Sequence, residues 1–211
     1  MGEFARAVAA APVAALVFAL PAAAAQAPSI KATPVTVGSF TQVTLAGTTG
    51  STKAGETVYV QAKECGVPNF HVIAAPQSVA GGSWATSAVV EITTSFRARV
   101  GSSYSRPIVA RKRAPLTLSK VPNGRIFLVR VFGGSGLVGR TVRIERHTVN
   151  GWVLVQRAKL RRSPISGVSV PFGISETNVR IKRRDLLLRA RLMDDQARPC
   201  FVGAASEAVR S

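Results

Sequence analysis

An internal repeat is the feature that most constrains the fold of this chain. Residues 43–47 and 55–61 match residues 128–133 and 139–145, with Gly-x-Thr-Val-x-Val in the first copy and Gly-x-Thr-Val-x-Ile in the second. Further matches follow in the same order: 70–75 with 152–157, 96–100 with 188–192, and 105–111 with 206–210. A repeat unit this long predicts two copies of a whole small domain and not the turns of a solenoid.

The matched blocks alternate apolar and polar residues with a period of two, which is typical of strands that bury one face. Val58 and Val60 are predicted to point inward, while Tyr59 and Gln61 face water. Helical periodicity is not evident after residue 25, so the blocks predict an all-β chain. In the second copy the predicted core positions are Val142, Ile144, Leu188, Ala190 and Leu192, and the predicted exposed positions are Arg143, Glu145, Arg189 and Arg191.

A hairpin is predicted where Val149-Asn-Gly-Trp152 separates two such blocks. The Asn-Gly pair suits a two-residue turn that needs positive φ at both central positions.

About seven short strands per copy, separated by Gly, Pro and Ser turns, predict two tandem immunoglobulin-like β-sandwich domains at residues 29–112 and 113–211. Gly81-Gly-Ser-Trp84, the two Arg-Ala-Arg strands and Gln196-Ala-Arg-Pro-Cys200 add to the repeat motifs. On these motifs the chain resembles two-domain secreted bacterial proteins with immunoglobulin-like or fibronectin-III-like folds and no assigned activity. The resemblance covers nearly all of the chain after the leader and implies a fold more than a task.

Residues 1–25 have the layout of a secretory signal peptide, in which Arg6 precedes an apolar run that ends in Ala23-Ala-Ala25. We expect cleavage before Gln26. Two prolines interrupt the run and its Ala content is high, which argues against a membrane anchor. A later apolar stretch of bilayer length is missing, so we expect a mature chain without a transmembrane span, secreted or associated with the cell surface.

Positive charge is concentrated in the second predicted domain. The whole chain has a net charge of +18; residues 29–112 contain 8 basic and 3 acidic residues, and residues 113–211 contain 19 and 6. Such an excess attracts polyanions over long range, and salt screens the attraction. A further basic run, Arg111-Lys-Arg113, lies at the domain junction, and the alternative interpretation of every cluster is a solvated face. The candidate polyanion-binding residues are Arg161, Arg162, Lys182, Arg183 and Arg184.

The two cysteines, Cys65 and Cys200, are predicted to form a disulfide between the domains. An even count in an exported protein favours pairing. Cys65 follows the third predicted strand of the first domain, and Cys200 lies between the last two strands of the second. In a tandem sandwich with a short junction these two ends abut, near the loop at residues 133–139. The alternative is two unpaired, half-buried thiols.

Patterns for catalysis or metal binding are weak. The only histidines, His71 and His147, lack an accompanying nucleophile motif, and Asp194-Asp195 lacks a calcium-loop pattern. Residues 134–139 satisfy G-x-G-x-x-G, but a predicted strand follows them where a dinucleotide site needs a helix. We therefore expect no enzyme activity, no cofactor and no metal site.

These observations predict a non-catalytic extracellular structural or adhesive module that contacts an envelope polymer or a protein partner. The alternative is a binding module for anionic glycans through the Arg-rich second domain, and an exported hydrolase is a third, weaker hypothesis. Nucleic acid is disfavoured as a partner, because export separates the protein from it and repeated exposed aromatic residues are missing.

Overall fold

The computed structural model describes residues 26–38, 42–122, 125–133, 135–164 and 173–211. The predicted signal peptide at residues 1–25 lies outside the described residues. In the described part the regular structure is β-sheet, apart from the 3-10 turn η1 (Ser135–Leu137) and the one-turn helix α1 (Asp194–Ala197), which confirms the predicted all-β class. Within these residues no helix is long and apolar enough to cross a membrane.

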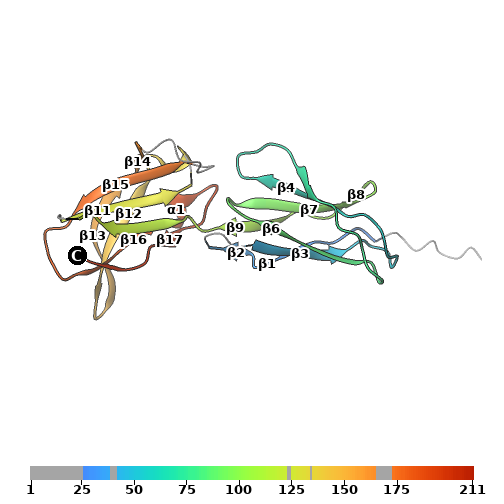
Figure 1. The fold of residues 1–211 in the computed structure, drawn as a ribbon, viewed down its shortest axis with the longest axis horizontal. Coiled ribbons are helices and arrows are strands. Elements are labelled where there is room, and N and C mark those ends of the chain that lie inside the picture. The colour runs from blue at the N-terminus through green and yellow to red at the C-terminus, as the bar shows by residue number, and fades with distance from the viewer. Residues whose placement is uncertain (1–25, 39–41, 123–124, 134, 165–172) are drawn as a thin grey trace, which may run out of the picture.

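The strands form two sheet pairs that lie end to end along the long axis of the molecule (Figure 1). In the first sheet pair, one sheet has the order β1 (Lys31–Thr33), β3 (Gln42–Thr48), β6 (Ser83–Val89). The other has the order β2 (Thr36–Val37), β9 (Ile108–Lys112), β7 (Thr94–Val100), β4 (Tyr59–Glu64), β5 (His71–Ala74), with β8 (Ser103–Tyr104) also on β7.

The second sheet pair has a similar plan. One sheet has the order β10 (Leu116–Lys120), β11 (Ile126–Phe132), β15 (Ile174–Arg180), β14 (Arg161–Arg162). The other has the order β13 (Gly151–Lys159), β12 (Thr141–Thr148), β16 (Leu187–Leu192), β17 (Ala204–Ala205), with β18 (Val209–Arg210) also on β16.

Each sheet pair encloses its own cluster of buried apolar side chains. Val60 and Phe96 belong to the first cluster, and Ile144 and Leu188 belong to the second; none of the four exposes more than 1% of its surface. Burying each such side chain stabilises the fold by about 1.5–3 kcal/mol. The period-two alternation in the sequence therefore places the predicted rows in the cores.

The two copies of the sequence repeat pair their strands in the same register. Gln61 lies opposite Arg97, and Glu145 lies opposite Arg189 at the matching position of the second sheet pair. Both hairpins also shift register at the matching place, after Val60 and after Ile144. Two matching loops are closed by the same hydrogen bond. The amide nitrogens of Ala98 and Ala190 donate to the hydroxyl oxygens of Ser105 and Ser206, and each bond is 2.9 Å long.

The predicted hairpin at Val149 is confirmed, but its predicted turn geometry is wrong. Thr148 pairs with Gly151, so the two turn residues are Val149 and Asn150. Gly151 has φ 101°, whereas Asp185 is the non-glycine residue with positive φ in the described part of the chain. Asn150 therefore keeps an ordinary negative φ. The glycine serves the first position of the returning strand, where the Thr148 hydroxyl donates to its carbonyl over 2.8 Å.

The predicted disulfide joins the two sheet pairs. Cys65 and Cys200 are bonded, with 5.3 Å between their Cα atoms. A backbone bond also crosses this junction, called the seam below: the Thr93 amide donates to the Cys200 carbonyl, while the Thr93 carbonyl accepts a bond from the Cys65 amide of its own sheet pair. Phe201 packs beside Gly133, so the Cys200 segment lies near the loop at residues 133–139 as predicted. Ile92 of the first sheet pair belongs to the second buried cluster, so the seam is also apolar.

Candidate functional site

A basic hollow of about 740 Å³ opens at the end of the second sheet pair away from the seam. Its lining contains five cationic side chains and one acidic side chain, that of Asp185. All five cationic residues are exposed. A concave surface with this charge is suited to binding an anion. The cationic residues of this hollow, called the basic hollow below, are Lys120, Arg125, Arg180, Arg183 and Arg184.

Strand ends position these cations. Lys120 ends β10 and pairs with Phe127, while Arg180 ends β15 and pairs with Ile126. Arg125 precedes β11, and its guanidinium donates to the Lys182 carbonyl over 3.1 Å. That bond ties the hairpin between β10 and β11 to the loop between β15 and β16.

The loop that carries Arg183 and Arg184 is held in an unusual conformation. Asp185 has φ 58°, in the left-handed region that few non-glycine residues adopt. The Ser211 hydroxyl donates a hydrogen bond of 3.2 Å to the Arg183 carbonyl and accepts one of 3.0 Å from the Leu186 amide. Such local strain is found most often at functional sites.

The structure brings together only part of the predicted basic cluster. Arg183 and Arg184 line the basic hollow, and Lys182 lies exposed beside them with its carbonyl bound to Arg125. Arg161 and Arg162 form β14 and pair with Glu176 and Ser175, at the opposite end of β15.

The two arginines of β14 therefore belong to another surface. Ser175 precedes Arg180 by five residues, which is about 17 Å along a strand. Arg161 also faces Glu176, whose carboxylate already pairs with Arg130 over 3.0 Å. The prediction that Arg161 and Arg162 act with the residues at 182–184 is not supported, because the two groups lie at opposite ends of β15. The spacing of residues in the sequence does not show which end of a neighbouring strand a pair of residues will join.

The junction run Arg111-Lys-Arg113 is not a continuous cationic surface. Lys112 is 3% exposed, and its ammonium donates to the Gly38 carbonyl. Burial lowers the pKa of Lys112 from 10.5, and the nearby carboxylate of Glu91 opposes that shift. Arg111 and Arg113 remain exposed on either side.

The remaining chemical candidates have structural partners. His71 lies 3.5 Å from the Glu64 carboxylate, and His147 packs edge-on against Trp152. Asp194 accepts a bond from the Gly203 amide over 2.6 Å, so it closes a loop. Among the described residues no group of three or more metal-ligating side chains gathers.

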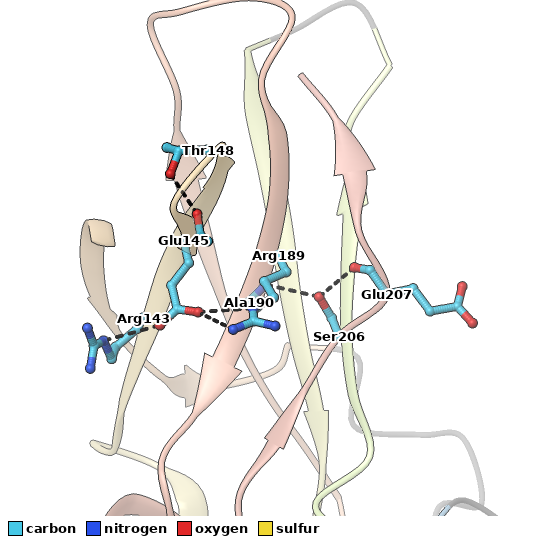
Figure 2. Close-up of polar contacts among 8 residues, drawn as sticks. Arg143, Glu145, Thr148, Arg189, Ala190, Ser206 and Glu207 are labelled. Atoms are coloured by element: carbon cyan, nitrogen blue, oxygen red, sulfur yellow. Dashed lines mark hydrogen bonds and ion pairs between the residues drawn. The ribbon is translucent and has the colours of Figure 1, made fainter. Parts of the chain in front are cut away.

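One predicted surface carboxylate is buried. Glu145 was expected to face water, but it is 2% exposed because Arg189 and Arg143 cover it. The Nε and Nη2 atoms of Arg189 each approach the Glu145 Oε2 atom at 2.9 Å, and Arg143 Nε lies 3.6 Å from Oε1 (Figure 2). Arg189 also stacks 4.2 Å from the Trp152 ring.

Comparison with known proteins does not place the chain in a family. No protein-family description matches the chain, and no curated protein matches it. The class is therefore defined by the structure itself: an all-β, sandwich-like protein with a disulfide across its seam and a basic hollow at one end.

Proposed function

We propose that this protein is a non-catalytic extracellular module that binds an anionic glycan or a similar envelope polymer through the basic hollow. The observation that carries the proposal is the convergence of five exposed cations from three strand ends and one strained loop on one concave surface. Exposed guanidinium groups offer paired N–H donors that fit carboxylate and sulfate oxygens. The rival function is a structural or adhesive module that contacts an envelope polymer or a protein partner through apolar loops.

We assign residues 29–112 and 113–211 to two tandem immunoglobulin-like domains as part of this proposal. The second sheet pair supports the assignment, since β10-β11-β15-β14 facing β13-β12-β16-β17 corresponds to the ABED and C′CFG sheets of that fold. The first sheet pair has a corresponding arrangement, with β2 added parallel to β9. The disulfide supports export, because such bonds persist in oxidising compartments.

The test is titration calorimetry with a sulfated heparin tetrasaccharide. R183Q/R184Q removes two cations of the hollow, and R161Q/R162Q removes two cations outside it. We expect the first variant to weaken binding about tenfold or more, since charge-assisted hydrogen bonds contribute about 1.5–3 kcal/mol each. The control should change binding by less than about threefold, an effect of net charge alone.

Salt separates this function from adhesion through apolar loops. Binding led by sulfate or carboxylate weakens steeply between about 50 and 300 mM salt, whereas an apolar contact does not. Equal losses in the two variants, or binding that is insensitive to salt, would contradict the role of the hollow.

A further inference from the structure

Three arginines lie side by side across the outer face of the sheet formed by β13, β12 and β16. Arg143 on β12 is directly opposite Arg157 on β13 and directly opposite Arg191 on β16. Their strand neighbours Val142 and Leu192 are buried, so the three arginines occupy the face turned away from the core. We call these three residues the arginine row.

The row continues toward the seam. Arg191 lines a hollow of about 340 Å³ together with Arg113, Arg189 and one carboxylate, Asp194, which accepts a bond from the Gly203 amide. Arg113, Arg157 and Arg191 are exposed, and none of the ion pairs among the described residues involves them. The Glu145 carboxylate is occupied by Arg189 and Arg143, as Figure 2 shows. Of the row, Arg143 therefore shares a carboxylate with Arg189, while Arg157 and Arg191 carry charge that none of these ion pairs compensates.

The first sheet pair shows that the fold does not require this row. Tyr59 stands at the position that matches Arg143, and Arg99 at the position that matches Arg191. There the arginine stacks 4.7 Å from the tyrosine ring. In the same sheet, Arg97 stacks on Phe70 and on Tyr104. The first sheet pair thus stacks Arg97 and Arg99 on its own aromatic rings.

Placing like charges directly opposite one another across strands is unfavourable. In the second sheet pair three arginines stand opposite one another on three adjacent strands. At the position that matches Arg143, the first sheet pair carries an aromatic ring, on which Arg99 stacks. An external anion would compensate the row. A row of cations separated by the strand spacing of about 5 Å matches a chain that carries an anionic group at about that interval.

We propose that the arginine row binds a linear polysaccharide that bears carboxylate or sulfate groups and lies across the strands. The inference rests on the proposed function and extends it from a single hollow to a second, elongated contact. Base stacking has little support here, because Arg189 covers one side of the Trp152 ring. The ligand class is therefore an anionic polysaccharide and not a single-stranded nucleic acid.

The experiment compares matched variants of the full mature chain. R157Q/R191Q removes two exposed cations of the row, and R106Q/R111Q removes two exposed cations of the first sheet pair. The probes are a sulfated heparin octasaccharide, an oligo-uronate of equal length that carries only carboxylates, and single-stranded DNA of similar charge. Affinity is measured over a range of salt concentrations, and circular dichroism checks the fold of each variant.

We expect R157Q/R191Q to weaken octasaccharide binding about tenfold and to lower the slope of log affinity against log salt by about two. R106Q/R111Q should change affinity by less than about threefold. Loss with the sulfated probe or with the oligo-uronate supports the inference and identifies the anionic group. Equal losses in the two variants, or stronger binding of the DNA, would overturn it.

The same variants separate this inference from the proposed function. In the R183Q/R184Q background the octasaccharide should retain binding that R157Q/R191Q then removes. If R183Q/R184Q changes nothing while R157Q/R191Q weakens binding, the hollow is wrong and the row is supported. If R183Q/R184Q weakens binding while R157Q/R191Q does not, the row is overturned and the hollow stands.

Discussion

Exchanging Glu145 and Gln61 tests whether the second sheet pair depends on a buried carboxylate where the first uses a neutral amide. The two residues occupy matching positions, and each faces an arginine in the same register. Gln61 accepts one bond from Arg97 Nε over 2.7 Å. The Glu145 carboxylate is contacted at 2.9 Å by both Nε and Nη2 of Arg189, and Arg143 Nε lies 3.6 Å from it. E145Q and Q61E therefore transfer one charge between two otherwise similar sites.

The magnitude follows from what each substitution leaves behind. E145Q keeps one acceptor for Arg189 Nε, as in the first sheet pair, but it loses the second contact and the charge that compensates two arginines. E145Q thus loses one of two charge-assisted contacts, each of which contributes about 1.5–3 kcal/mol, so we expect a loss of about 2–3 kcal/mol. E145A leaves Arg189 without its partner, and we expect about 3–5 kcal/mol. Gln61 is also buried, at 8% exposure, so in Q61E the desolvation of the new carboxylate and its attraction to Arg97 largely offset each other, and stability should change by less than about 1 kcal/mol.

Urea unfolding followed by tryptophan fluorescence measures these differences. Trp84 is buried in the first cluster and Trp152 lies beside Arg189, so a W84F background reports the second sheet pair through Trp152. The E145Q loss should persist at high salt, because the Glu145 carboxylate is buried and poorly screened. A loss below about 0.5 kcal/mol for E145Q, or an equal loss for Q61E, would refute the reasoning.

Three further predictions concern the row and the seam. R157Q should raise stability by about 0.2–1 kcal/mol at low salt and by nothing measurable at about 1 M salt, because it removes one like-charge neighbour of Arg143; stability that falls at low salt would count against the row. C65A/C200A should lower the unfolding free energy by about 2–4 kcal/mol, and recovery of both cysteines as free thiols from exported protein would end the assignment. The pKa of Lys112 is lower in the folded chain than in the unfolded chain, so between the folded pKa and 10.5 the unfolded chain binds more protons. The free energy of unfolding therefore rises with pH across that window. K112M should lack this rise when urea unfolding is followed at alkaline pH up to 10.5, and an unchanged profile would contradict it.

The sequence predicts faces of strands well because the side-chain direction alternates regardless of tertiary structure. Val60, Ile144 and Leu188 lie in the cores for this reason. The disulfide was also predictable, since an even cysteine count in an exported chain favours pairing and a tandem sandwich with a short junction places Cys65 and Cys200 at abutting ends. Local turn geometry was less accessible: the hairpin at Val149 forms, but its glycine serves the strand and not the turn centre.

The basic surfaces were harder to predict because they depend on register and on strand ends. Lys120 and Arg125 are far from Arg180 and Arg183 in sequence, and the four meet only because the end of β10, the start of β11 and the end of β15 lie together. Runs of adjacent basic residues are a poor guide to such a site. Lys112 lies within one run and is buried. A search for cations at the ends of predicted neighbouring strands would have found the hollow.

The repeat provides an internal comparison that separates the needs of the fold from those of binding. Both sheet pairs keep the same register, the same bulge position and the same serine-closed loop, so these features belong to the fold. Outer-face chemistry differs at matching positions: Arg99 stacks on Tyr59, whereas Arg191 faces Arg143. R143Y brings the residue of the first sheet pair into the second. If the row exists only for an external anion, R143Y should preserve the fold and weaken octasaccharide binding, and a variant that binds as tightly as the wild type would show that Arg143 has no part in recognition.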